Sequence, residues 1–130
     1  MTQRTPPATA MRVVAEPARI AGVRRAVRAQ LRAWGREDLA PAAALCVTEM
    51  LANVYRHAGS PECDLTLDDL AAEGVRAAVS DRSPVLPVVA PGPPDRTAEG
   101  GRGLLLIAAT AHRWGVLPTP EGKQVWVLLR

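Results

Sequence analysis

The sequence predicts an α+β two-layer sandwich in which three helices lie on one face of a mostly antiparallel mixed sheet. One observation behind this prediction is that apolar residues recur every three or four positions in two long segments, as in amphipathic helices. Another is that apolar and polar residues then alternate, as in half-buried strands. The links between successive strands are also short enough for hairpins, which favours antiparallel pairing.

Length and composition fit one soluble globular domain. The chain has 130 residues, of which 48% are hydrophobic and 22% are charged. No apolar run approaches the ~20 residues that cross a bilayer, and the opening MTQRTPPATA lacks the apolar stretch of a secretory signal. We therefore expect a cytoplasmic protein that makes no contact with a membrane. Cys46 and Cys63 could form at most one bridge, and buried free thiols are the expectation.

The elements follow one another without an internal repeat. Residues 1–10 are polar and contain prolines, so we expect a disordered tail there and a single domain over residues 11–130. The elements are predicted at residues 11–15 (strand), 17–35 and 39–58 (helices), 62–68 and 75–80 (strands), 103–112 (helix), and 114–117 and 123–129 (strands). Asp38 is the expected N-cap of the second helix. The last strand is apolar on both faces, which predicts that it is central or covered by a partner.

The first predicted helix carries a run of arginines beside its apolar stripe. Its members are Arg24, Arg25, Arg28, Arg32 and Arg36. A solvated helix face is the commoner explanation of such a run, and a docking surface for an acidic partner is the alternative. The net charge of +3 permits an acidic partner without requiring one. Aromatic residues make up only 3%, too few for a base-stacking platform, so direct binding of nucleic acid is not expected.

Three polar residues, Glu49, Asn53 and His57, lie four positions apart on the second predicted helix. This spacing places their side chains along one edge of the helix. An acid and an amide at such an edge could bind Mg²⁺, which prefers oxygen ligands. The alternative is an ordinary polar helix face.

Two further motifs follow the second hairpin strand. Asp81 comes directly after an apolar strand, where a carboxylate can accept a hydrogen bond from a ligand amine or cap a turn. A proline-rich segment then leads to glycines that open the third helix. Glycines let a backbone approach a ligand closely, and a helix start offers N–H groups to a phosphate. The alternative is a flexible hinge.

Taken in order, these motifs form a larger pattern. The segments are ExxxNxxxHA in the second helix, DRSP after a strand, a proline-rich loop, and GRGLLL in the third helix. This pattern resembles the GHKL ATP-binding fold and, more narrowly, the small anti-sigma-factor serine/threonine kinases and their actinobacterial relatives. The opening RRAVRAQLRAWG and the closing WG and GKQVW are similar to the same group. The resemblance covers about residues 11–130.

The resemblance implies a role for each matching residue. Glu49 would be the catalytic base, Asn53 would bind the Mg²⁺ that bridges the ATP phosphates, and Asp81 would accept a hydrogen bond from the adenine amino group. The other nucleotide-binding residues that it implies are Arg56, His57, Ser83, Pro84, Gly100, Gly101, Arg102, Gly103 and Leu104. Residues 82–100 would form the lid over ATP.

The implied function is an ATP-binding regulator that uses ATP and Mg²⁺ to phosphorylate a serine or threonine of an antagonist protein, or sequesters a sigma factor, or does both. Its partners would be a sigma factor and the anti-anti-sigma antagonist, and the family suggests a homodimer. The alternative is a nucleotide-sensing protein-binding module that no longer transfers phosphate, although the presence of Glu49 favours a kinase. Structural roles are expected for the cysteines and His112, and core positions for Trp34, Trp114 and Trp126.

Overall fold

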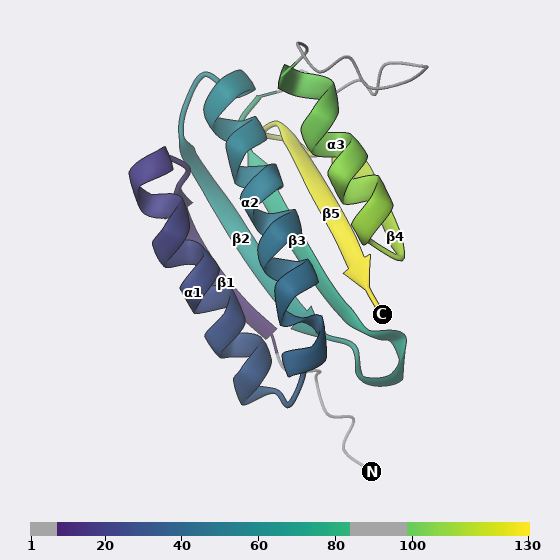
Figure 1. The fold of residues 1–130 in the computed structure, drawn as a ribbon. Coiled ribbons are helices and arrows are strands. Elements are labelled where there is room, and N and C mark those ends of the chain that lie inside the picture. The colour runs from purple at the N-terminus through teal and green to yellow at the C-terminus, as the bar shows by residue number, and fades with distance from the viewer. Residues whose placement is uncertain (1–7, 84–98) are drawn as a thin grey trace.

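The computed structural model describes residues 8–83 and 99–130, with side chains from residue 104 onward in the second part. The elements are, in chain order, β1 (Ala8–Val14), α1 (Pro17–Ala33), η1 (Glu37–Leu39), α2 (Ala40–His57), β2 (Glu62–Asp69), η2 (Ala71–Glu73), β3 (Val75–Asp81), α3 (Glu99–Thr110), β4 (Arg113–Pro118) and β5 (Lys123–Leu129). The three α-helices lie on one face of the sheet (Figure 1). The predicted two-layer α+β sandwich is therefore confirmed.

The five strands form one sheet in the order β1-β2-β3-β5-β4. Every pairing among the described strands is antiparallel. β5 lies between β3 and β4, so it is an internal strand, as its apolar residues on both faces predicted. The register of β3 and β5 places Asp81 directly opposite Lys123.

The core lies between the sheet and the helices. In β2, Cys63, Leu65 and Leu67 are buried under the helices, whereas Glu62 and Asp64 point to the other face and are exposed. The helices contribute buried apolar side chains from α1 (Val27, Leu31), α2 (Ala43, Val47, Met50, Leu51, Val54) and α3 (Leu104, Ile107). Each buried leucine of this core contributes about 1.5–3 kcal/mol of stability, so the layers are held by ordinary hydrophobic packing.

The sheet face opposite the helices carries Trp126, contrary to the prediction that all three tryptophans are core residues. Trp34 and Trp114 do pack against the core. Trp126 instead lies opposite Gly115 on β4, where a Cβ would come within 2.8 Å of the indole nitrogen. The guanidinium of Arg76 lies 5.8 Å from the centre of the Trp126 ring, within cation–π range. The strand alternation that buries Val125 and Val127 places Trp126 on the outer face.

The ends of two elements near the N-terminus differ from the prediction. β1 begins at Ala8, within the predicted tail, because its pairing with β2 continues to Asp68. The Thr9 hydroxyl also donates a hydrogen bond to Gln30 Oε1 at 2.6 Å, which ties this end of the strand to α1. Asp38 lies in the short helix η1 and makes no capping bond, so Leu39 occupies the N-cap position of α2.

The third helix begins earlier than predicted. It starts at Glu99 rather than near Gly103, because glycine weakens a helix without preventing it and no proline follows Pro94 in this stretch. An acidic residue in the first turn is also favourable to the helix dipole. Most of the predicted lid lies outside the described residues, which resume at position 99.

No helix in the part of the chain that the structure describes is both long enough and apolar enough to span a membrane.

Candidate functional site

The buried polar and charged side chains of the described residues gather at one point of the molecule. They belong to Asp81, Ser83 and Lys123. The Lys123 ammonium lies 3.1 Å from Asp81 Oδ1 and 2.9 Å from Oδ2, and the two side chains are only 7% and 3% exposed. The backbone N–H of Ser83 donates to Asp81 Oδ1 at 2.8 Å. The carboxylate predicted to bind a ligand amine is therefore already paired with a cation of the protein.

The strand pattern explains why these groups meet. Asp81 continues the inward phase of Val79 at the end of β3, and Lys123 begins the inward phase of Val125 in β5. Gly122 permits the close crossing that brings them together. A Cβ at this position would clash with the carbonyl oxygen of Asp81 and would lie 2.6 Å from the carbonyl carbon of Arg82. Any other residue at position 122 would push the end of β3 away from β5.

The second helix brings an unpartnered carboxamide to the same end of the molecule. Both polar atoms of the Asn53 side chain are buried and have no hydrogen-bond partner among the residues that the structure describes. A buried amide without partners costs about 1–3 kcal/mol, so such a group calls for a ligand or a functional reason. The C-terminal half of α2, the end of β3 and the first turn of α3 lie at the same end of the fold (Figure 1). Asn53, in the helix layer, and Asp81, in the sheet, therefore both lie at that end of the fold.

Glu49 lies one helical turn before Asn53 and is half-buried. Its carboxylate acts on a neighbouring thiol: burial, and then the charge of Glu49, raises the pKa of Cys46 to about 11. Burial and the charge of Asp81 raise the pKa of Cys63 in the same way, to about 12, although Arg12 lowers it. Both cysteines are free and buried, so neither is a thiolate at neutral pH, and neither is a reactive group.

The remaining predicted residues have different positions. Arg56 and His57 are exposed in the last turn of α2. Leu104 is buried in the core, where it anchors α3. The backbone of 100–103 forms the first turns of α3, so the predicted phosphate loop is helical. Pro84 and the side chains of 100–103 lie outside the described residues.

Lys123 is the site residue that the motif analysis missed. It has the same inward phase as Val125, Val127 and Leu129, which is an unusual position for a lysine. Its neighbour Gln124 faces the opposite side of the sheet. There Gln124 Nε2 donates to the Ser80 hydroxyl at 3.2 Å, and Gln124 Oε1 accepts from Arg76 at 2.8 Å.

A cavity of about 260 Å³ opens beside Asp81, where β2 begins and β3 ends. Arg82, Thr119 and Glu121 contribute to its lining, together with residues of the outer sheet face such as Asp64. Glu49 and Asn53 do not line it, and its walls carry charges of both signs. The cavity therefore does not unite the predicted site residues.

Comparison with known proteins agrees with this architecture. The chain matches the histidine kinase-like ATPase domain family over residues 13–129. It is also 41% identical over 71 residues to an uncharacterised protein of Streptomyces coelicolor, an alignment that covers 54% of this chain and 68% of that protein. The family match includes every described helix and nearly all of the sheet. The chain belongs to the histidine kinase-like ATPase domain family.

Proposed function

We propose that the chain binds Mg-ATP where α2, α3 and the ends of β3 and β5 meet, and that it acts as an anti-sigma-factor-type regulator. In this role it phosphorylates a serine or threonine of an antagonist protein, sequesters a sigma factor, or does both. The observation that carries the proposal is the buried Asn53 carboxamide, which has no hydrogen-bond partner among the described residues and lies at the same end of the fold as the buried Asp81 carboxylate. The family assignment supports the nucleotide, and the motif order supports the narrower role.

The residues present fit a magnesium nucleotide. Mg²⁺ prefers oxygen ligands, keeps several waters, and is held in such sites by one or two protein oxygens plus phosphates. Asn53 Oδ1 is a buried oxygen with no partner in the described part of the chain, and Glu49 lies one turn away. No group of three His, Cys, Asp or Glu side chains that could hold a metal exists in the described residues. Bound Mg²⁺ would neutralise phosphate charge, and its hold on the protein would depend on the nucleotide.

Glu49 is the proposed catalytic base. Phosphoryl transfer depends on positioning and charge stabilisation more than on covalent chemistry, so a carboxylate that accepts the proton of the acceptor hydroxyl is sufficient. Its half-buried position in the middle of α2 fixes it on a rigid element. Asp81 would accept a hydrogen bond from the exocyclic amine of adenine, at the far end of the site from the reacting phosphate.

The test of nucleotide binding is thermal unfolding of the full chain with and without Mg-ATP. A ligand at 100 times its Kd stabilises the folded state by about 2.7 kcal/mol, and we expect Asp81→Asn to abolish this shift. Asp64→Asn is the matched control, because Asp64 is exposed on the outer sheet face and pairs with Arg12. No shift of the wild type in millimolar Mg-ATP contradicts the proposal.

Kinase and sensor are separated by Glu49→Gln. A kinase should keep its Mg-ATP shift in this variant and lose transfer of the labelled γ-phosphate to an antagonist protein, typically by 10²–10⁴-fold. Wild-type protein that binds Mg-ATP and leaves every candidate antagonist unlabelled supports the nucleotide-sensing module instead.

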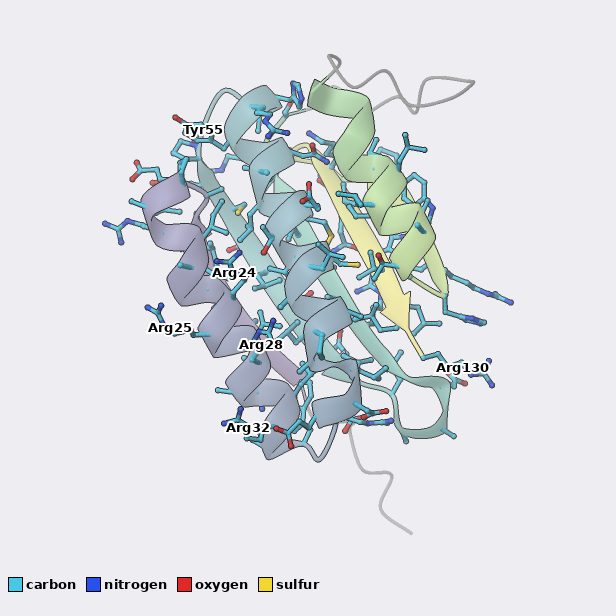
Figure 2. All side chains as sticks on the ribbon, viewed as in Figure 1. Arg24, Arg25, Arg28, Arg32, Tyr55 and Arg130 are labelled. Carbon is cyan, nitrogen blue, oxygen red and sulfur yellow. The ribbon has the colours of Figure 1, made fainter. Side chains whose placement is uncertain are left out.

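The arginines of α1 are the proposed docking surface for an acidic partner. Figure 2 shows Arg24, Arg25, Arg28 and Arg32 along this helix. Arg36 does not belong to the surface, because its guanidinium is bound to Asp69 at 2.7 Å, and Arg32 lies 3.4 Å from Glu37. Among the described residues, Arg24, Arg25 and Arg28 make no ion pair, so their charge is available.

We expect Arg24→Glu/Arg28→Glu to weaken binding of a sigma factor or antagonist, and added salt to weaken wild-type binding. Nucleotide affinity should not change, because α1 is remote from the ends of β3 and β5 (Figure 1). Arg113→Glu/Arg130→Glu, at two exposed arginines outside α1, changes the net charge by the same amount and is the control. Partner binding that survives the double substitution at low salt rejects this surface.

A further inference from the structure

The buried pair of Lys123 and Asp81 is the feature that the proposed function leaves unexplained. Removing two charges from water costs several kcal/mol per ion, and a buried ion pair often stabilises a fold no more than apolar residues of the same size. The pair terminates two neighbouring strands whose other inward residues are apolar. A hydrophobic pair would serve packing equally well at this position. Function is the better reason for a buried lysine here.

The pair still has free hydrogen-bonding capacity. A carboxylate offers about four lone-pair sites. Among the described residues, Asp81 Oδ1 accepts from Ser83 N–H and from Lys123, whereas Oδ2 accepts from Lys123 alone. One acceptor site on Oδ2 is therefore open. The ammonium has three N–H donors and uses at most two of them on the carboxylate, so at least one donor is open next to that acceptor.

We infer that Lys123 is a specificity-determining residue of the proposed nucleotide site and that it donates a hydrogen bond to a ring nitrogen of the base. This inference rests on the proposed function, in which Asp81 accepts from the exocyclic amine. Adenine carries its amine between two ring acceptors, N1 and N7, and each lies next to that amine. The open acceptor of Asp81 can pair with the amine of adenine, and the open donor of Lys123 can pair with the neighbouring ring nitrogen. An isolated carboxylate could make only the first of these two hydrogen bonds.

Two other roles of Lys123 predict different results. A purely structural lysine would hold β3 to β5 and would not distinguish one ring atom of the base from another. A blocking lysine would occupy the acceptor that the amine needs, so removing it would tighten nucleotide binding. If Lys123 contacts a ring nitrogen, its substitution should weaken the binding of ATP and leave unchanged the binding of an analogue that lacks this nitrogen.

The first experiment changes only the ligand. Binding of Mg-ATP to the wild-type chain is compared by calorimetry with binding of two ATP analogues in which C–H replaces N1 or N7. We expect one of the two analogues to bind about tenfold more weakly than ATP, because a hydrogen bond to a charged donor is lost. Equal affinity for all three nucleotides overturns the inference and leaves the proposed function intact. Absence of binding by all three rejects both.

The second experiment completes the cycle with Lys123→Met. The variant should bind ATP about tenfold more weakly than the wild type, and it should no longer distinguish ATP from the weak analogue. Gln124→Met is the matched control, because its side chain lies on the opposite face of the same strand. A folded Lys123→Met variant that binds ATP as tightly as the wild type, or more tightly, overturns the inference. The ligand comparison decides the question if this variant does not fold.

Discussion

At the scale of single residues, Asn53 has a cost to the fold that a bound ligand would offset. Its carboxamide is buried in α2 with no hydrogen-bond partner among the described residues, and Glu49 and His57 lie one turn before and after it. Helix packing alone would favour a leucine at this position. A residue that weakens the free protein is a residue whose stability and function can be separated by experiment.

We expect Asn53→Leu to raise the free energy of unfolding of the ligand-free protein by about 1 kcal/mol, since an unsatisfied amide is replaced by apolar surface. The same variant should show no stabilisation by Mg-ATP. Both quantities come from one set of denaturant titrations with and without the nucleotide.

The control for this variant is Thr48→Val in the same helix. The Thr48 hydroxyl donates to the Ala44 carbonyl at 2.7 Å, so it has a partner and no ligand is needed to explain it. Thr48→Val should retain the Mg-ATP shift. If Asn53→Leu is less stable than the wild type and is still stabilised by Mg-ATP, the Asn53 carboxamide neither destabilises the ligand-free protein nor contributes to binding of Mg-ATP.

At the scale of elements, one ion pair joins the end of α1 to the turn between β2 and β3. Arg36 donates to Asp69 Oδ1 at 2.7 Å and to the Ala71 carbonyl, and Asp69 Oδ1 also accepts from Ala71 N–H at 3.0 Å. Ala71 has a φ of 55°, an unusual backbone conformation for a residue other than glycine. These contacts hold the turn where the strand pair reverses.

The same contacts make stability depend on pH. The hydrogen bond from Arg36 holds the pKa of Asp69 below its ordinary value of 3.8. A lowered pKa in the folded state means that the stabilisation is fully present above the unfolded pKa and is lost as pH falls through the folded pKa. We expect Asp69→Asn to cost about 1 kcal/mol at pH 7, a value reduced for partial exposure, and this difference should shrink below about pH 4. Urea titrations at a series of pH values measure it.

Asp64→Asn provides the comparison. Its pair with Arg12 is 3.0 Å long, but both side chains are 57% exposed. We expect a change within about 0.5 kcal/mol at every pH. A loss in Asp69→Asn that stays constant down to pH 2 would mean that the charge of Asp69 is not what stabilises the turn.

The element patterns also show where the sequence was sufficient. Alternation in Cys63, Leu65 and Leu67 predicted which side of β2 is buried, because one buried face forces a period of two. Alternation in β5 likewise contains the inward phase of Lys123. The sequence did not indicate which residue lies opposite Lys123 in the sheet. Asp81 meets Lys123 only because β5 inserts between β3 and β4, a strand order that no local pattern specifies.

Local patterns were also insufficient at helix starts. Asp38 has the right chemistry for an N-cap, yet the chain makes a 3₁₀ turn there, with Leu39 N–H bonded to the Arg36 carbonyl at 3.0 Å. Arg36, whose carbonyl accepts this bond, is also held by a tertiary bond from its side chain to Asp69, 33 positions away in the chain. The sequence motifs named Glu49, Asn53 and Asp81 as candidate site residues. The pairing of Lys123 with Asp81 became visible only in the tertiary structure.

At the scale of the whole molecule, α3 is the element whose attachment should depend most on a ligand. It packs on α2 and reaches the core through Leu104 and Ile107, whereas Leu106 is 37% exposed. The C-terminal end of α1, by contrast, is tied to β1 by the Thr9–Gln30 hydrogen bond, and Arg36, shortly after the helix, is bonded to Asp69 at the end of β2. Elements with few buried contacts open locally at low free energy.

We therefore expect Mg-ATP to slow hydrogen exchange most strongly in the amides of α3 from Leu104 onward and at the end of β3. In the proposed site a nucleotide between Asn53 and Asp81 would lie beside the first turn of α3, so we expect opening of that helix to compete with binding of the ligand. The amides of β1 should exchange at unchanged rates wherever they exchange by local opening, since β1 lies at the far edge of the sheet. Exchange mass spectrometry with Asp81→Asn as the control measures both regions. Equal slowing of β1 and α3 would show that the ligand stabilises the fold without engaging α3, and would place the nucleotide elsewhere.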